Sequence, residues 1–377
     1  MKLLKRLPLP SLLGALAIAA GLTQSIGVYD DDYVLWSDFP AAMFCVVVGG
    51  ALLLLGGIWL RRLAHGVTWQ YLGPLALLVT GFGPLLLPSA ELQQGTLAPG
   101  LWLVVLGIAL FAWQVMQHVA ALPQDRLRNI LVPALFGLTL LYFWQAITVG
   151  FAVPKVLLPA PSDICLALWR SAAILVDDFK QTFMKAVIAG FIIGNMLGIL
   201  VALLVDRSPF LQRGLLPLGN FISAVPVIGV APIMVMWFGF GWESKTAVIV
   251  FMIFFPMLIN ALAGLAAADR MLQDLMRSYG AGYWTTLFKL RLPVALPFLF
   301  NAFKINSTLA LIGAIVAEFF GSPTAGLGFR ISVEVGRMNV DVVWATIAVA
   351  ALAGSLSYGL LAVIERSFTF WHPSYRS

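Results

Sequence analysis

Residues 269–293 read DRMLQDLMRSYGAGYWTTLFKLRLP. The first part of this segment predicts a helix over residues 270–279, with an apolar stripe on one side and charged groups on the other. The stripe consists of Met271, Leu275 and Met276. Gly280 follows, and glycine adopts the backbone of a tight turn without a steric cost. A second short helix comes next, and we expect Pro293 to end it before the following apolar run.

Long apolar runs lie on both sides of this segment. Of the 377 residues, 61% are hydrophobic and only 11% are charged, which is too little polar surface to cover a water-soluble protein of this size. A helix needs about twenty apolar residues to cross the hydrocarbon core of a bilayer. Runs of this kind lie at 10–29, 41–60, 70–88, 100–120, 129–150, 183–205, 214–238, 245–267, 296–317 and 342–364. We therefore expect an all-α integral membrane protein with about ten transmembrane helices.

The distribution of basic residues predicts the orientation of these spans. With the N-terminus in the cytoplasm, the inner segments hold sixteen Lys and Arg residues and the outer segments hold seven, as the positive-inside rule requires. Both termini and residues 269–293 are then cytoplasmic. The first run follows Lys2, Lys5 and Arg6 and lacks a small-x-small cleavage site, so we expect an uncleaved span rather than a signal peptide.

The pattern of loops changes near residue 125. The first four runs are joined by short loops that carry no motif tied to chemistry, whereas the last six have long, patterned connections. We expect an accessory four-helix transmembrane region at 1–125 and a functional core of six transmembrane helices at 126–377. The amphipathic helix of the core either enters a groove of a cytoplasmic protein partner or lies on lipid headgroups, and the residues alone favour neither interpretation.

The segment at 269–293 resembles the signature of ABC importer permeases, which runs Glu-Ala-Ala, three residues, Gly, nine residues, Ile, one residue, Leu-Pro. Asp274 keeps the carboxylate of the signature, and Gly280 and Pro293 keep its spacing, whereas Leu275 and Met276 are bulkier than alanine. The resemblance implies that this loop couples the permease to an ATPase subunit. The residues implied in coupling are Asp274, Leu275, Met276, Arg277, Gly280, Ala281, Leu290, Leu292 and Pro293.

Three further motifs resemble the branch of this family that serves nitrate, sulfonates and taurine. They are Leu158-Pro159-Ala160-Pro161-Ser162-Asp163, Trp237-Phe238-Gly239-Phe240-Gly241, and Glu318 with Gly326-Leu327-Gly328. The match covers roughly residues 126–377. It implies a multi-pass permease of the bacterial cytoplasmic (inner) membrane that works by alternating access. It also implies a homodimer of permease chains, two copies of an ABC ATPase subunit and an extracytoplasmic substrate-binding protein.

We expect this chain to be a transport subunit and not an enzyme. The sequence has no Gly-x-x-x-x-Gly-Lys-Ser/Thr phosphate loop, so ATP and Mg²⁺ are expected in the partner ATPase. Cys45 and Cys165 are too few and too differently placed for a metal site or a disulfide framework, and the three His residues lie far apart. The basic residues are scattered and form no stripe for nucleic acid.

Polar residues of the core spans have two interpretations. They line a passage for a small polar or anionic solute, or they form hydrogen bonds between helices. These residues are Ser223, Asn260, Asn301, Asn306 and Ser307. At the outer end of a span, Glu318 is interpreted together with Gly326 and Gly328 as a docking site for the binding protein, or as a solvated or capping carboxylate.

Small residues recur along one apolar run of the core. Gly190, Gly194 and Gly198 lie four residues apart, so we expect one face of this helix to let a neighbouring helix approach closely.

The main alternative is a secondary transporter driven by an ion gradient. Proton relays use carboxylates inside the membrane, and no Asp or Glu falls within the ten runs, which disfavours this alternative. A membrane enzyme is disfavoured as well, because the acidic cluster at residues 30–32 has no base or histidine beside it. Nitrate, an organosulfonate, taurine, bicarbonate and a vitamin precursor all fit the resemblance as solutes.

Overall fold

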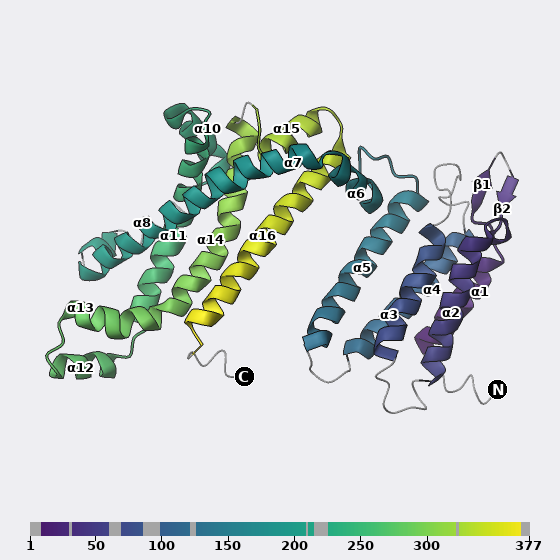
Figure 1. Ribbon diagram of the computed structural model, residues 1–377, viewed down its shortest axis with the longest axis horizontal. Helices are drawn as coiled ribbons and strands as arrows, with labels where there is room; N and C mark the ends of the chain where they lie inside the picture. The colour runs from purple at the N-terminus through teal and green to yellow at the C-terminus, as the bar shows by residue number, and fades with distance from the viewer. Residues whose placement is uncertain are drawn as a thin grey trace. The chain divides into compact units, whose positions relative to one another are not determined.

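A computed structural model of the chain provides its architecture (Figure 1). It describes residues 9–29, 32–59, 69–85, 99–120, 126–208, 210–214, 225–321 and 324–370. The chain divides into two compact units, Met1–Asp163 and Ile164–Ser377. The predicted path residue Ser223 lies outside the described residues.

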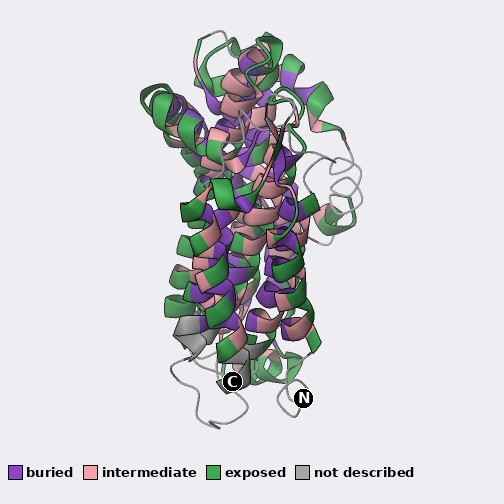
Figure 2. Cartoon of the chain, turned by 90° about the vertical axis from the view of Figure 1, so that its right-hand side faces the viewer, coloured by how far each residue is buried: buried purple, intermediate pink, exposed green. Residues whose placement is uncertain are grey.

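The first unit consists of apolar helices and one short hairpin. Its elements are α1 (Leu9–Leu22), β1 (Gly27–Tyr29), β2 (Asp32–Val34), η2 (Trp36–Asp38), α2 (Pro40–Trp59), α3 (Trp69–Leu85), α4 (Pro99–Ala120) and α5 (Arg126–Gly150). The two strands are antiparallel, with Gly27 opposite Val34. The sequence analysis did not predict this hairpin. Buried residues alternate with exposed ones along the helices (Figure 2). Trp36 and Phe111 are fully buried in the core of this unit.

The second unit is helical throughout its described part. Its elements are α6 (Pro161–Arg170, which includes the boundary), α7 (Ala172–Phe179), η4 (Lys180–Val187), α8 (Ile188–Arg207), α10 (Val227–Phe238), α11 (Trp242–Ala266), α12 (Arg270–Ser278), α13 (Tyr283–Thr286), η5 (Leu287–Arg291), α14 (Leu292–Gly321), α15 (Leu327–Gly336) and α16 (Val340–Phe368). The segments η4 and η5 are π-helical. Each continues directly into the α-helices on both sides of it, so that residues 172–207 and 283–321 form two long helices.

Six helices of the described residues are long and apolar enough to cross a membrane. They are Pro99–Gln117, Asn129–Gly150, Ala172–Arg207, Trp242–Ala266, Tyr283–Gly321 and Val340–Phe368. Four shorter apolar helices correspond to the other predicted runs: Leu9–Leu22, Pro40–Leu55, Gly73–Leu85 and Val227–Phe238. The helical fold class is confirmed.

Helix α11 lies at the centre of the second unit, between α8 and α14. The glycine stripe of α8 faces α11: a Cβ added to Gly194 would lie 2.5 Å from Cγ1 of Ile253, and one added to Gly198 would lie 2.8 Å from Cβ of Met257. The predicted close approach of a neighbouring helix is therefore confirmed. Without these glycines, α8 and α11 would be pushed apart.

The expected end of a helix at Pro293 is wrong. The helix passes through η5 and continues to Gly321. In η5 the backbone is wound more widely, and the Leu292 N–H bonds to the Leu287 carbonyl, five residues earlier. Proline ordinarily breaks a helix because its ring clashes with the preceding turn and because it has no N–H. We attribute the continuity to the π-helical turn, which relieves that clash immediately before Pro293.

The glycine stripe generates a test of the α8–α11 interface. Gly194→Ala is expected to lower the thermal unfolding temperature of the purified chain, because overpacking costs about 1–3 kcal/mol. Gly137→Ala in α5 is the matched control, since a Cβ there would meet nothing within 4 Å. Size-exclusion profiles after heating measure both effects. Equal shifts in the two variants would contradict this account of the interface.

Candidate functional site

The segment at 269–293 forms a helical hairpin at one end of the second unit (Figure 1). Helix α12 begins at an N-cap, where the Asp269 carboxylate accepts a bond of 2.9 Å from the Met271 N–H. The helix ends at Ser278, and Gly280, which follows it, has a left-handed φ of +74°. The Ala281 N–H bonds back to the Met276 carbonyl at 3.0 Å. The predicted pair of short helices meeting at a glycine is confirmed.

The apolar stripe of α12 lies on the surface of the unit. None of its residues is buried, and Met271 is 76% exposed and Leu275 51% exposed. Asp274 and Arg277 form an ion pair of 3.5 Å on the exposed surface. Because exposure of an apolar stripe to water is unfavourable, this helix has the properties of a contact surface. Leu290, Leu292 and Pro293 are half-buried at the base of the segment.

The Arg291 side chain attaches the base of the segment to the ends of α8 and α11. The Arg291 guanidinium makes a two-point ion pair with the Asp206 carboxylate at the end of α8, with both N–O distances 2.7 Å. Its Nε also donates to the Leu265 carbonyl in the last turn of α11 at 3.1 Å. The side chains of Arg291 and Asp206 are only 15% and 13% exposed. The sequence analysis did not identify Asp206.

Aromatic side chains surround this ion pair. The Tyr283 hydroxyl donates to Asp206 at 2.9 Å. The Arg207 guanidinium lies 4.8 Å from the ring centre of Tyr283 and 5.0 Å from that of Trp284, within the range of a cation–π interaction. Below them, Leu287 is fully buried among apolar side chains of α8, α11 and α14. The segment at 269–293 is thus attached to the helical core through both polar and apolar contacts.

The predicted path residues lie in different surroundings. Asn306 is fully buried, where its Nδ2 donates to the Asn195 side-chain oxygen at 2.6 Å and to the Ile253 carbonyl at 3.1 Å. Asn260 bonds to the Pro256 carbonyl of its own helix, and Asn301 is exposed. The Asn306 contacts match the interpretation of hydrogen bonds between helices.

Ser307 has different neighbours from Asn306. It lines a cavity of about 460 Å³ together with Phe179, Phe183 and Phe191. Its hydroxyl donates to the Lys304 carbonyl, one turn earlier in its own helix. The structure does not bring the described path candidates together around one cavity.

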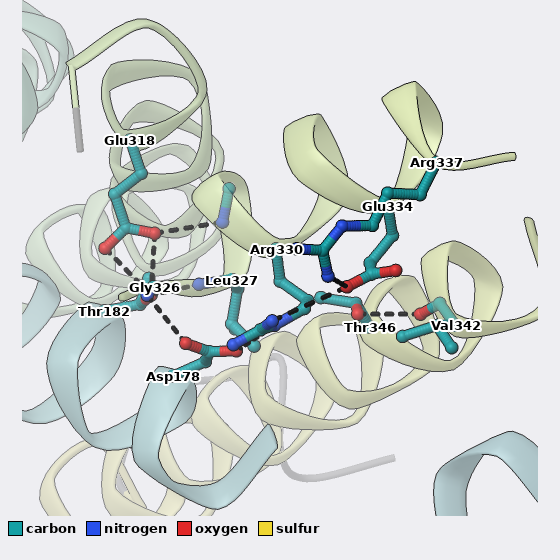
Figure 3. Close-up of polar contacts among 11 residues, drawn as sticks. Asp178, Thr182, Glu318, Gly326, Leu327, Arg330, Glu334, Arg337, Val342 and Thr346 are labelled. Atoms are coloured by element: carbon teal, nitrogen blue, oxygen red, sulfur yellow. Dashed lines mark hydrogen bonds and ion pairs between the residues drawn. The ribbon is translucent and has the colours of Figure 1, made fainter. Parts of the chain in front are cut away.

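A second polar cluster lies at the other end of this unit, where α7, η4, α14 and α15 meet (Figure 3). Three consecutive backbone N–H groups at the start of α15 each donate to a different side chain. Gly326 donates to Asp178 at 2.9 Å, Leu327 to the Thr182 hydroxyl at 2.8 Å, and Gly328 to Glu318 at 3.0 Å. The first turn of α15, whose N–H groups have no partner within the helix, is capped by these side chains.

The geometry explains the Gly-Leu-Gly motif. Gly326 has a φ of +133°, and a Cβ there would lie 2.5 Å from the carboxyl carbon of Glu318. A Cβ at Gly328 would collide with the Ile315 carbonyl oxygen. Glycine is therefore required at both positions for α15 to approach α14 so closely.

Glu318 is not solvated, but its interpretation as a capping carboxylate is confirmed, because it accepts a hydrogen bond from the Gly328 N–H at the start of α15. Its side chain lies inside the unit with 2% exposure, and the Thr182 hydroxyl lies 2.7 Å from one of its oxygens. Glu318 and Glu365 each lie one residue beyond the apolar runs at 296–317 and 342–364, but still within long helices. These helices extend past the apolar runs, and their end carboxylates find partners: Glu365 pairs with Lys304 at 2.6 Å. Pairing makes burial of charge tolerable.

Asp178 also binds Arg330, which follows the Gly-Leu-Gly motif in α15. Its second oxygen pairs with Nε of Arg330 at 2.7 Å, and Glu334 lies 3.6 Å from the same guanidinium. Burial alone would lower the pKa of Arg330, but the hydrogen bond and charge of Asp178, with Glu334, raise it above its ordinary value. Arg330 therefore stays charged and holds α15 against α7. The sequence analysis missed Asp178 and Thr182, which lie more than a hundred residues from the motif.

This cluster generates a stability test. Thr182→Val removes the hydroxyl that bonds Glu318 and leaves the Leu327 N–H unpaired, and an unpaired buried polar group costs about 1–3 kcal/mol. We expect a lower thermal unfolding temperature in detergent. Thr308→Val is the matched control, since the Thr308 hydroxyl bonds only within its own helix on an exposed face. An unfolding temperature of Thr182→Val equal to that of the control would refute the assignment.

Known proteins resemble this chain over its C-terminal part. The family model of the binding-protein-dependent transport system inner membrane component matches residues 194–370. A "Probable ABC transporter permease protein" of Haemophilus influenzae is 31% identical over 59% of this chain and 89% of its own length. The riboflavin transport system permease protein RibX of Chloroflexus aurantiacus is 30% identical over 62% of this chain and 88% of that protein.

Two further relatives carry other names. The formylaminopyrimidine transport permease protein ThiX of Halalkalibacterium halodurans is 30% identical over 64% of this chain and 96% of its own length. The taurine transport system permease protein TauC of Escherichia coli is 28% identical over 62% of this chain and 86% of that protein. The chain belongs to the family of binding-protein-dependent transport system inner membrane components, the multi-pass permease subunits of ABC importers.

Proposed function

We propose that this chain, as a homodimer, moves a small polar or anionic solute into the cytoplasm by alternating access, driven by two copies of an ABC ATPase subunit. The observation that carries the proposal is the hairpin of α12 and α13. Its exposed apolar stripe is available to a protein partner, and its second helix continues without a break into α14, a core helix of 30 residues. A movement of the hairpin would therefore be passed directly to the core.

The ATPase is proposed to bind α12 in a groove, in the way that amphipathic helices are commonly recognised. Met271 and Leu275 would enter the groove, and the Asp274–Arg277 pair would fix the orientation at its rim. Gly280 and Ala281 would form the turn that sets the angle between α12 and α13. ATP and Mg²⁺ would be bound by the ATPase and not by this chain.

The proposed orientation places α12 in the cytoplasm. Within the second unit, α12, α13 and the end of α16 lie at one end, and α10 and α15 lie at the other (Figure 1). With α12 facing the ATPase, the C-terminal end of α16 is cytoplasmic too, as the distribution of basic residues predicts. The extracytoplasmic binding protein would then meet the end that carries α15.

The docking role of Glu318, Gly326 and Gly328 is proposed to be indirect. All three are buried, so they would hold α15 in place while the exposed Val335 of α15 and Met338 just after it face a binding protein. The functional core is proposed to begin near residue 126, with the accessory helices at 1–125. Helix α5 would serve the permease core, although it belongs to the first compact unit.

The solute class rests on the relatives and on the polar candidates. Relatives are named for riboflavin, formylaminopyrimidine and taurine, all of them small polar molecules. Of the candidates Asn260, Asn301, Asn306 and Ser307, we favour Asn301, whose side chain is exposed in the single chain and available to line a passage in a dimer.

Coupling through the hairpin is tested at its turn. Gly280→Val is expected to abolish co-purification of the ATPase or to uncouple it, because a β-branched side chain is strongly disfavoured at positive φ. Gly282→Val is the matched comparison, since Gly282 has a φ of −73° and tolerates a side chain. Affinity purification from the native host with mass spectrometry measures the association. Normal ATPase recovery and normal ATP-driven transport with Gly280→Val would contradict the proposal.

A further inference from the structure

The ion pair beneath the hairpin lies in an electrostatically unexpected place. Asp206 is in the last turn of α8, where the negative end of the helix dipole disfavours a carboxylate. Its partner Arg291 lies 85 residues away in the sequence. A carboxylate in this position is stabilised by its fork of two 2.7 Å bonds to the guanidinium and by the Tyr283 hydroxyl.

The Asp206–Arg291 ion pair connects the hairpin to α8, a helix that is not continuous with the hairpin in the chain. Tyr283 and Arg291 lie on the continuous helix of α13, η5 and α14. Asp206 belongs to α8, and Leu265, the third partner, belongs to α11. A displacement of α13 would reach α14 through covalent bonds, but it reaches the ends of α8 and α11 only through side-chain contacts. Arg291 makes polar contacts with both ends.

We infer that Asp206 and Arg291 are positioning residues that transmit the movement of the hairpin to α8 and α11. The inference rests on the proposed ATPase coupling of the same segment. The contact is suited to transmission because it is largely shielded from water, has two-point geometry and is reinforced by Tyr283 and by the stacked Arg207. The α8–α11 glycine interface then carries the movement onward as one body.

The experiment uses the chain purified with its ATPase and reconstituted in lipid nanodiscs. An environment-sensitive fluorophore is attached at Leu204→Cys, an exposed position on α8 two residues before Asp206, in a Cys45→Ser, Cys165→Ser background. The probes added are Mg-ATP and vanadate. The readouts are the fluorescence response of α8 and the rate of ATP hydrolysis, so no solute is needed.

Two variants remove the contact in different ways. Asp206→Asn removes the charge, and Arg291→Lys keeps a positive charge but loses the fork and the Nε bond to Leu265. In both variants we expect the fluorescence response of α8 to fall at least about fivefold, which is the low end of typical coupling effects. The ATPase should stay bound and continue to hydrolyse ATP. Asp177→Asn is the matched control, because it breaks an exposed ion pair with Lys180 and should leave the response unchanged.

The outcomes are distinguishable. Full responses of α8 in Asp206→Asn and Arg291→Lys would overturn the inference. Loss of ATPase binding together with the response would also overturn it, since that result indicates a structural role alone. If Asp206→Asn does not accumulate in the membrane, Arg291→Lys decides by the same criteria, since it leaves Asp206 with a cationic partner. A wild-type complex without an ATPase or without any ATP response would refute the proposed function itself.

Discussion

Three ion pairs between side chains that are largely shielded from water join different helices of the second unit, and the arrangement of the unit depends on them. At the end that carries the hairpin, Arg291 joins Asp206 and Lys304 joins Glu365. At the other end, Asp178 joins Arg330. In a bilayer, an unpaired charge or backbone group costs several kcal/mol. Each pair therefore specifies which helices meet, besides stabilising the fold.

Between these two ends the core is apolar and closely packed. The α8 glycines let α11 approach within contact distance, and the buried Asn195–Asn306 hydrogen bond connects α8 to α14. Such an interface moves as a rigid body more readily than it deforms. A transporter that changes its accessible side requires this combination, because a small movement at the hairpin must reach the distant end without being absorbed on the way.

The sequence predicted the features that depend on local patterns. The apolar runs, the helix–glycine–helix hairpin and the glycine stripe of α8 follow from periodicity and spacing, and the structure contains all three. Features that depend on distant partners were missed or misjudged. The burial of Glu318 could not be predicted, because it depends on Thr182, which lies 136 residues away in the sequence. The helix continues past Pro293 after a π-helical turn that no residue pattern identifies.

The central claim is that α12 contacts the ATPase while the α15 end faces the opposite side of the membrane. A photo-crosslinking amino acid placed at Met271 in α12, which is 76% exposed, tests it in intact cells against the same amino acid at Met338, which follows α15 and is 64% exposed. Our account predicts an adduct with a phosphate-loop ATPase from position 271 and none from position 338. Capture of the ATPase from position 338, or its absence from position 271, would contradict the account.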